Sequence, residues 1–267
     1  MCRVLKVTRS AYYAWLANPV SSWDSANDIL LTHIITCFEE SYGTYGIKRI
    51  HRSLLQKGIQ CGESRVAKLM KNNRIVPIRR TRKPYSGKGQ RDEVTDNVLA
   101  RQFTAEKPNQ VWVTDMTYIA TQNGFAYLTA VLDLYSRAIV GWEVADAPKT
   151  DLMISAVSKA LLSRAPIEPV LLHSDQGTQY TSKVFRDWCR DKNITTSMSR
   201  KGNCHDNAVM ESFFSSLKKE WIQGKRYLSV AELRSALSIY IDGFYNKKRL
   251  HSSNNYRAPL DFEEQFM

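Results

Sequence analysis

Three acidic residues occupy positions where a carboxylate is costly to bury. Asp115 interrupts an apolar, strand-like run over residues 111–119, and Asp175 directly follows a second such run, residues 170–174. Glu211 lies near the apolar side of a predicted helix. A buried carboxylate needs a cation or hydrogen-bond donors to offset its lost hydration. If the helix packs on the strands, the three acids converge, and their oxygens form a site of the kind that selects Mg²⁺ or Mn²⁺ over zinc.

Each of these acids also has an ordinary structural explanation. Asp115 can accept hydrogen bonds at a strand end, Asp175 can be a turn residue, and Glu211 can be an exposed helix charge. A serine hydrolase triad is a poor alternative, because His173 and Ser174 are neighbours on one strand and their side chains point to opposite faces. The joint interpretation is favoured by the basic N-terminal part of the chain.

The chain of 267 residues carries a net charge of +12, and most of this excess lies in its N-terminal part. Residues 1–110 contain 19 basic and 9 acidic side chains, and the segment from Arg65 to Arg91 contains ten Lys or Arg and no Asp or Glu. Such a segment attracts a polyanion through counterion release, so nucleic acid is the leading partner. A solvated linker that only keeps the protein soluble is the alternative.

Residues 24–76 show helical periodicity, interrupted by glycine-containing turns. A short helix over residues 47–56, followed after a turn by a helix capped by Ser64, indicates a helix-turn-helix. This last helix is expected to leave Arg65 and Lys68 free on its outer side, where they can contact DNA in the major groove. A small helical bundle with a basic surface has the same pattern, so this motif is less specific than the acids.

Residues 77–108 have no hydrophobic periodicity and are predicted to form an extended basic linker or arm. This linker separates a helical domain, residues 1–76, from a sheet-containing domain, residues 109–225, which is followed by a C-terminal helix and tail, residues 226–267. Phosphates rather than bases are the expected DNA contacts of the linker. The side chains that we expect to supply these contacts are Arg79, Arg80, Arg82 and Lys83.

The chain after residue 109 begins with three β-rich runs and then alternates helices and strands. The runs 110–121, 125–134 and 138–145 predict an antiparallel meander. The later predicted elements are a helix at 150–164, a strand at 169–173, a helix at 182–192, a strand at 194–198 and helices at 207–221 and 230–245. This order indicates an α/β fold with a mixed sheet covered by helices. The last twenty residues are polar and are expected to follow the surface.

Two features of the composition exclude other classes of protein. Apolar runs such as residues 29–35 are far shorter than the roughly 20 residues that a membrane span requires. The five cysteines are widely spaced and include no Cys-x-x-Cys pair, which indicates reduced thiols rather than a disulfide scaffold or a zinc ribbon. We therefore expect a cytoplasmic protein without a membrane segment.

Three sequence blocks carry a family resemblance. They contain Val-Trp-Val-Thr-Asp-Met-Thr-Tyr-Ile at 111–119, His-Ser-Asp-Gln-Gly-Thr-Gln-Tyr at 173–180 and Asn-Cys-His-Asp-Asn-Ala-Val-Met-Glu-Ser at 203–212. These blocks closely resemble the DDE transposases of bacterial insertion sequences, above all the second-reading-frame (OrfB) product of the insertion-sequence-three family. Asp175 and Glu211 are 36 positions apart, which is the spacing of that family. The resemblance covers nearly the whole chain, with one departure at His205, where the family usually has Trp.

The resemblance implies an RNase H-like, integrase-like catalytic domain preceded by a small all-α helix-turn-helix domain. In such a domain Asp115, Asp175 and Glu211 hold two Mg²⁺ or Mn²⁺ ions. In the general two-metal scheme the ions lie about 3.5 to 4 Å apart and stabilise the attacking and leaving oxygens of an in-line displacement. The implied nucleophile is water for strand nicking and a 3′-hydroxyl for strand joining.

The resemblance also implies DNA contacts beside the three acids. Lys218 lies two helical turns after Glu211 and is expected to hold a phosphate, with an ordinary solvated lysine as the alternative. Arg200 and Lys201, in the loop before Glu211, are expected to contact the scissile or target strand. The implied partners are the terminal inverted repeats of a mobile element and its target DNA, bound by a homo-oligomer at the bacterial nucleoid. In the resembled family this frame is commonly joined to an upstream-frame protein by a frameshift fusion.

Two other functions fit the same sequence features. A non-catalytic DNA-binding regulator would use only residues 24–91 and would bind DNA without cutting it. A nuclease of the same fold would hydrolyse DNA strands and never join them. Assays of nicking and of strand joining separate these alternatives from a transposase.

Overall fold

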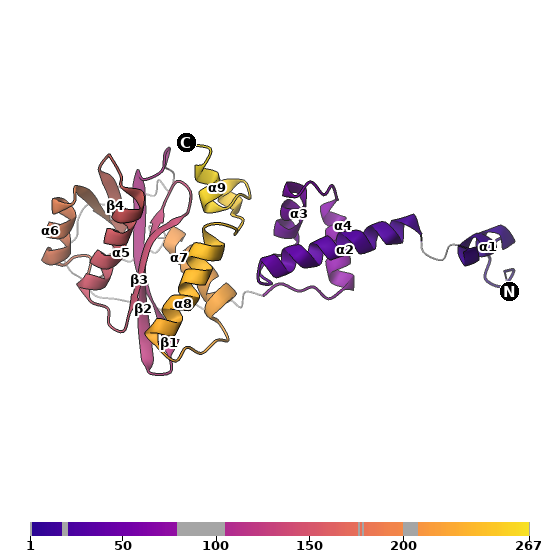
Figure 1. Ribbon diagram of the computed structural model, residues 1–267, viewed down its shortest axis with the longest axis horizontal. Helices are drawn as coiled ribbons and strands as arrows, with labels where there is room; N and C mark the ends of the chain where they lie inside the picture. Colours follow the sequence, from indigo (N-terminus) through magenta and orange to yellow (C-terminus); the bar gives the residue numbers. More distant parts are fainter. Residues whose placement is uncertain are drawn as a thin grey trace. The chain divides into compact units, whose positions relative to one another are not determined.

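The structure is a computed structural model that describes residues 2–17, 21–78, 105–175, 177, 179–199 and 208–266. The chain forms two compact units, Met1–Arg79 and Arg80–Met267, whose elements are labelled in Figure 1. Several residues singled out in the sequence lie outside the described residues: Arg79, Arg80, Arg82, Lys83, Arg200, Lys201 and His205.

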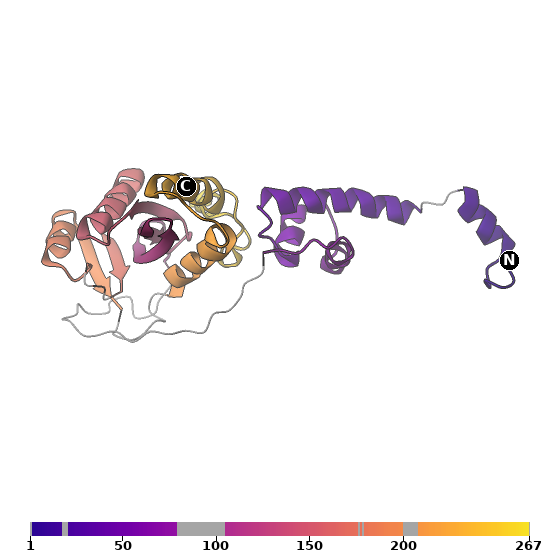
Figure 2. The ribbon, with the colours of Figure 1, turned by 90° about the horizontal axis from the view of Figure 1, so that it is seen from below.

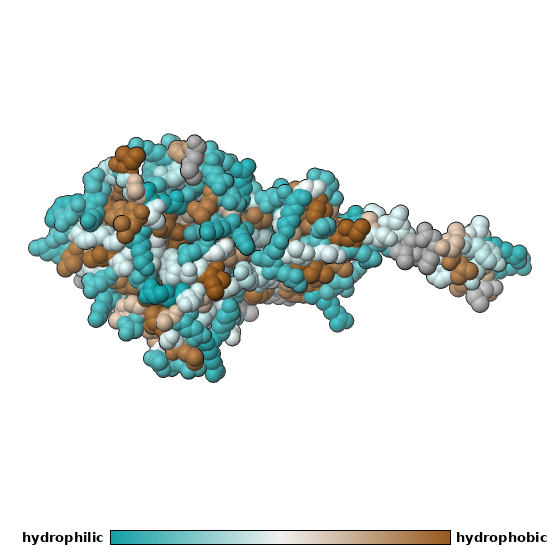
Figure 3. All heavy atoms as spheres, viewed as in Figure 1, coloured by the Kyte–Doolittle hydropathy of each residue, from teal (hydrophilic) through white to brown (hydrophobic). Residues whose placement is uncertain are grey.

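In its described residues, the first unit contains four helices, of which three share a core. These are α1 (Arg9–Ala17), α2 (Ser22–Glu40), α3 (Ile47–Gln56) and α4 (Glu63–Asn72). The last three bury one apolar stripe each, as their periodicity predicts; the buried side chains are Leu30, Ile34, Cys37, Ile50, Leu54, Val66 and Met70. Helix α1 buries none of its residues, and apolar side chains are visible on its surface in Figure 3.

The predicted helix-turn-helix corresponds to α3 and α4, which pack against each other and against α2. Gly58 in the turn has φ of 78°, a conformation that favours glycine. The prediction that Ser64 caps the second of these helices is wrong. The helix begins at Glu63, so Ser64 lies inside its first turn, and Gly62 is the N-cap without a side-chain hydrogen bond.

The second unit is built on a five-stranded mixed sheet. The strands are β1 (Val111–Thr121), β2 (Gly124–Asp133), β3 (Ile139–Ala145), β4 (Val170–Ser174) and β5 (Ile194–Met198). Their order is β3-β2-β1-β4-β5, with antiparallel β1–β2 and β2–β3 pairs and parallel β1–β4 and β4–β5 pairs. The predicted meander and mixed sheet are therefore confirmed.

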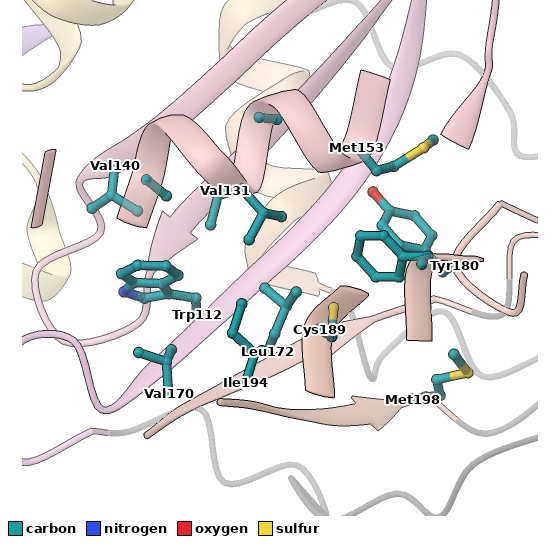
Figure 4. Packing of buried hydrophobic residues seen from close by; sticks show 14 of the residues in the cluster. Trp112, Val131, Val140, Met153, Val170, Leu172, Tyr180, Cys189, Ile194 and Met198 are labelled. Carbon is teal, nitrogen blue, oxygen red and sulfur yellow. The ribbon is translucent and has the colours of Figure 1, made fainter. Parts of the chain in front are cut away.

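Helices cover both faces of this sheet. Helices α5 (Thr150–Arg164) and α6 (Lys183–Asp191) lie on one side, and α7 (Ala208–Leu217) and α8 (Val230–Ser238) lie on the other, as Figure 2 shows. A continuous apolar core joins the sheet to α5 and α6; Figure 4 labels Trp112, Leu172 and Ile194 from three strands and Met153 and Cys189 from the helices. Within the described ranges, no helix is long and apolar enough to cross a membrane.

Gly141 in β3 allows α5 to lie close to the sheet. A Cβ atom at this position would lie 2.3 Å from the carbonyl oxygen of Ala156 and 2.7 Å from the nitrogen of Ala160, both in α5. We expect Gly141→Ala to lower the free energy of unfolding by about 1 to 3 kcal/mol or more, because backbone atoms cannot yield to the added methyl group. Urea denaturation of the purified variant measures this change.

A second glycine provides the matched control for this prediction. Gly243 lies in the π-helical segment η3 (Ile239–Tyr245), and a Cβ atom there meets nothing within 4 Å. Gly243→Ala is therefore expected to leave stability unchanged or slightly raised. If Gly141→Ala were as stable as Gly243→Ala, the close approach of α5 to β3 would be contradicted.

Two predicted long helices change their winding near their ends. The helix predicted at 207–221 is the α-helix α7 up to Leu217 and then the π-helical segment η2 (Lys218–Ile222). The helix predicted at 230–245 likewise divides into α8 and η3. Single π-helical turns are rare and often lie at functional sites. The first of these transitions falls at a residue that the sequence singled out, Lys218.

The expectation that the last twenty residues follow the surface fits most of their described side chains, but several of them are buried. Asn254, in the 3₁₀ turn η4 (Ser252–Asn254), is buried and donates to the carbonyl of Ser136 in the β2–β3 turn. Glu263 in α9 (Pro259–Glu263) is 3% exposed and accepts a bidentate pair of hydrogen bonds from Arg164 of α5. Burial of these two polar side chains is tolerated because each is hydrogen-bonded, Asn254 to a main-chain carbonyl and Glu263 to the guanidinium group of Arg164.

Candidate active site

Two of the three singled-out acids lie side by side at one edge of the sheet. Strands β1 and β4 are parallel neighbours, and Val113 pairs with His173. Asp115 and Asp175 each follow these paired residues by two positions, so they lie at the same level at the end of the paired segment. The carboxyl ends of parallel strands are where sites on α/β sheets form.

Each aspartate is fixed by a backbone N–H near its own position. The Oδ1 atom of Asp115 accepts from the amide of Met116 at 2.7 Å, and Oδ1 of Asp175 accepts from the amide of Gly177 at 3.0 Å. No other hydrogen bond reaches either carboxylate from the described residues. The carboxylates are therefore oriented, with acceptor capacity left for a ligand.

The electrostatic environment disfavours negative charge on both aspartates. Burial raises the pKa of Asp115 to about 7; the charges of Asp175 and Glu211 add to this rise, and the Met116 amide and Lys218 partly oppose it. Burial also raises the pKa of Asp175, and the Gly177 amide partly opposes that rise. Nearby positive charge and hydrogen bonds therefore do not fully offset the cost of burying the two carboxylates.

Glu211 and Lys218 approach the same site from α7 and η2. Glu211 lies in the first turn of α7 with an exposed side chain, and its charge acts on Asp115. Lys218 is half-buried; burial lowers the pKa of its ammonium group, while Asp115 raises it. Its Nζ atom lies 4.9 Å from the centre of the Tyr118 ring. All four charged residues thus belong to one electrostatic cluster.

The carboxylates do not form a closed metal cage. In the described part of the chain, no three His, Cys, Asp or Glu side chains are arranged to hold a metal ion. Asp115 and Asp175 nevertheless provide oxygen donors only. Their raised pKa values show that the negative forms are disfavoured, and a cation bound between them would stabilise those forms. This donor set fits a hard divalent ion such as Mg²⁺ better than zinc.

Tyr180 is a buried neighbour of the two aspartates to which the sequence assigned no role. Its side chain is 1% exposed, and its hydroxyl lies 3.2 Å from the hydroxyl of Thr114. Burial raises the pKa of Tyr180 well above its usual value, and the charges of Asp115 and Asp175 raise it further. Its position five residues after Asp175, beyond the strand end, is the sequence signal that could have identified it.

A buried ion pair fixes the helix end that carries Lys218. Glu220 in η2 accepts from Nε of Arg249 at 2.7 Å and from its Nη2 at 2.6 Å, and it also accepts from the Tyr240 hydroxyl at 2.8 Å. The side chains of Arg249 and Glu220 are 2% and 8% exposed. Such a bidentate, desolvated pair has a defined geometry, so it restrains η2 and with it Lys218.

Among the described residues, His173 and Ser174 make separate hydrogen-bond contacts. His173 contacts the Ser197 hydroxyl through Nδ1 at 3.0 Å, and the Ser174 hydroxyl donates to the main-chain carbonyl of Asp175. The described contacts therefore leave Ser174 without a histidine base.

In the first unit, the predicted DNA contacts differ in their surroundings. Lys68 is exposed on α4, as expected. The expectation that Arg65 is free is wrong: its Nε donates to Asn27 at 2.8 Å, and its guanidinium lies 4.2 Å from the centre of the Trp23 ring. Both partners belong to α2, because the α2–α4 contact brings that helix over the N-terminal turn of α4.

Comparisons with known proteins match both units. Two integrase core domain models match residues 105–204 and 192–259, and a model of an HTH-like domain matches residues 25–83. A 31 kDa protein of insertion element IS600 from Shigella sonnei is 36% identical and covers 100% of this chain and 98% of its own length. Transposase InsF of insertion sequence IS3A from Escherichia coli K12 is 34% identical, covering 99% of this chain and 93% of its own length.

Among solved structures, the sheet and helices resemble the integrase fold. The simian T-cell lymphotropic virus intasome, in complex with the PP2A regulatory subunit B56 gamma, gives a TM-score of 0.51 with 14% identity. The match covers 80% of this chain and 70% of that one. This likeness supports the mixed-sheet, RNase H-like fold.

Proposed function

This chain belongs to the IS3 family of bacterial insertion-sequence transposases. We propose that it cuts and joins DNA strands and that Asp115, Asp175 and Glu211 are its catalytic carboxylates. The observation that carries the proposal is the pair of aspartates just beyond the paired segment of β1 and β4, with the charges of Glu211 and Lys218 acting on Asp115. Phosphoryl transfer requires such a concentration of oxygen donors beside the scissile phosphate.

We propose that the two aspartates and Glu211 hold Mg²⁺ or Mn²⁺, two ions per site. When bound, these ions supply Lewis-acid stabilisation of the attacking and leaving oxygens. The chain's own contribution is to present three carboxylates in a partly desolvated site and to orient two of them through the Met116 and Gly177 amides. Glu211, whose side chain is exposed, supplies the third donor.

We assign to Lys218 the task of holding a DNA phosphate beside the carboxylates. Its ammonium group is half-buried against the Tyr118 ring, and the Glu220–Arg249 pair holds the helix segment that carries it. A cation that is already fixed loses little conformational freedom when a phosphate binds. The α3–α4 unit, with Lys68 exposed, binds duplex DNA, and Arg65 contributes there if DNA displaces it from Trp23.

Nicking and joining assays test the proposal against its alternatives. The substrate is duplex DNA carrying the ends of the element, with and without Mg²⁺, and a second DNA is supplied as target. We expect Mg²⁺-dependent nicks and joined products. Binding without cutting would indicate a regulator, and nicks without joined products would indicate a nuclease.

We propose that the basic arm strengthens DNA binding through phosphate contacts. Replacing Arg79, Arg80, Arg82 and Lys83 together by Gln is expected to weaken binding to all duplex sequences. Each lost phosphate contact removes about 0.9 from the slope of log affinity against log salt concentration, so the four substitutions are expected to remove roughly 3 to 4. A salt titration of duplex affinity in EDTA measures the slope.

The matched control for the arm variant is a triad variant, Glu211→Gln, which is expected to keep the wild-type slope. If the slope of the arm variant were also unchanged, the arm would be a solvated linker. The phosphate contacts of the protein would then belong to other basic residues, such as Lys68 or Lys218.

We further propose that the protein works as a homo-oligomer on the inverted repeats of its element and on target DNA, in the bacterial cytoplasm at the nucleoid. An upstream-frame protein, or a frameshift fusion to it, would supply additional end recognition. Arg200 and Lys201 are proposed contacts to the scissile or target strand. Size measurements of the protein mixed with end DNA test the oligomer.

A further inference from the structure

The hairpin of β1 and β2 exposes two aromatic rings close to the candidate active site. Tyr118 is 61% exposed and Phe125 is 54% exposed. Their ring centres are 5.4 Å apart, with an interplanar angle of 88°. Since Tyr118 pairs with Tyr127 and Ala120 pairs with Phe125, the two rings lie on the same face of the hairpin. Because more than half of each side chain is exposed, the ring surface outside this edge-to-face contact and the contact with Lys218 is available to a ligand.

This aromatic pair borders the edge at which the carboxylates lie. Pairing of β1 with β4 ends at Val113, so the later part of β1 has no β4 partner. Strand alternation puts Tyr118 and Asp115 on opposite faces of β1, on either side of that open edge. Lys218 links the two, because its Nζ lies 4.9 Å from the Tyr118 ring and its charge acts on Asp115.

The surroundings of the pair are basic and are held in place. The hairpin tip is fixed by a hydrogen bond from the Gln122 amide to the carbonyl of Tyr227 at 2.9 Å. The segment just before Tyr227 carries Lys225 and Arg226, both exposed. Residues 116–127 and 223–228 contain no acidic side chain, and the one acid bonded to this segment, Glu232, accepts from the Leu228 amide at 2.6 Å and is outnumbered by Lys218, Lys225 and Arg226. The charge of this surface therefore complements a phosphate backbone.

We propose that Tyr118 and Phe125 form a stacking site for an unpaired nucleobase of the DNA strand that enters the active site. Bases within a duplex are stacked on one another and cannot reach a ring face, whereas unpaired bases stack on exposed aromatic residues regardless of sequence. Lys218, with Lys225 and Arg226, contacts the phosphates of the same strand. This inference rests on the proposed function and makes its substrate more specific: a DNA end whose terminal nucleotides are opened.

Binding of single-stranded tails in EDTA tests the stacking site without requiring cleavage. The probes are one short duplex with a single-stranded thymidine tail and the same duplex with an abasic tail of equal length. The wild-type protein is expected to prefer the base-containing tail. Since stacking on an aromatic residue contributes about fivefold to a hundredfold in affinity, Tyr118→Ala with Phe125→Ala should reduce the preference by a similar factor. The ratio of the two affinities cancels the contribution of the duplex.

Three further variants make this test specific. Tyr118→Phe retains a ring and is expected to retain the preference. Phe266→Ala removes an exposed ring elsewhere in the same unit, 52% exposed, and is expected to change nothing. Lys218→Gln removes a phosphate contact and is expected to weaken both tails equally.

Two results of the binding assay would overturn the inference: equal binding of the two tails by the wild-type protein, or an unchanged preference in the double alanine variant. A concentration-dependent dimer that the double variant abolishes, without any tail preference, would assign the pair to a second copy of the chain and would also overturn it. Because the assay contains no metal, failure of the proposed catalysis leaves its result unaffected. Conversely, the carboxylate variants could lose activity as expected while the wild-type protein shows no tail preference. That combination would refute only the stacking site.

Discussion

Asp115→Asn, Asp175→Asn and Glu211→Gln are each expected to reduce nicking and joining by at least about a hundredfold while the protein remains folded. Each change keeps the shape of the side chain and removes the charge that a divalent cation requires. A bound ion contributes several kcal/mol to transition-state stabilisation, and each 1.36 kcal/mol is a factor of ten in rate. The rate of product formation on labelled DNA at saturating Mg²⁺ measures the loss.

Asp151→Asn is the matched control for these variants. Asp151 is an exposed carboxylate in the first turn of α5, and its neutralisation is expected to leave the rate nearly unchanged. Circular dichroism and a salt titration of DNA affinity in EDTA show whether each variant is folded and binds DNA. Activity above a few per cent of wild type in any of the three carboxylate variants would remove that residue from the catalytic set.

The sheet was predictable because its pattern is local. Alternating and continuous apolar runs identified all five strands to within one or two residues at their ends, and the helix at Thr150–Arg164 was predicted at its observed bounds. The carboxylates Asp115 and Asp175 stood out because they interrupt or end apolar strands, where burying a carboxylate is costly. Local pattern does not show which strands are neighbours. The β1–β4 pairing that brings these acids together is a contact between distant segments.

The surroundings of Lys218 depend on contacts that periodicity does not encode. The α-helical pattern continues past Leu217, yet the chain winds as a π-helix there. Glu220 pairs with Arg249, which lies 29 residues later in the chain, and helical spacing gives no sign of this partner. The contact between Arg65 and Trp23 is not predictable for the same reason: an exposed basic position on a helix is assigned without knowledge of the helix that packs beside it.

The C-terminal segment shows that polar composition is a poor guide to exposure. Asn246 is a polar residue, yet its side chain is buried and pairs with both the amide and the carbonyl of Ile139 in β3. Asn254 and Glu263 are buried in comparable roles. Buried polar groups are tolerated when hydrogen bonds replace their lost hydration, and those partners lie more than a hundred residues away in the chain for the two asparagines.

In EDTA, the wild-type protein is expected to lose stability relative to Asp115→Asn as the pH rises from about 4 to about 7. The pKa of Asp115 is raised from 3.8 to about 7, so in this range the folded state binds the proton more tightly than the unfolded state. Stability therefore falls by about 1.4 kcal/mol for each step of one pH unit in this range, to a total of at most roughly 4 kcal/mol. Urea denaturation of both proteins at pH 5 and at pH 8 measures the change in the free energy of unfolding.

Mg²⁺ is expected to reverse this loss in the wild-type protein, because a cation between the carboxylates favours their charged forms and binds only the folded state. Asp115→Asn should gain little from Mg²⁺. Asp133→Asn is the matched control: Asp133 is another buried aspartate with a raised pKa, but its oxygens accept from the amides of Asn109 and Tyr135. That variant should be destabilised and should still respond to Mg²⁺ as the wild type does. Equal stabilisation of Asp115→Asn and wild type by Mg²⁺ would contradict a metal site at Asp115. If Asp115→Asn were less stable than the wild type at pH 8 in EDTA, the electrostatic cost assigned to this carboxylate would be contradicted.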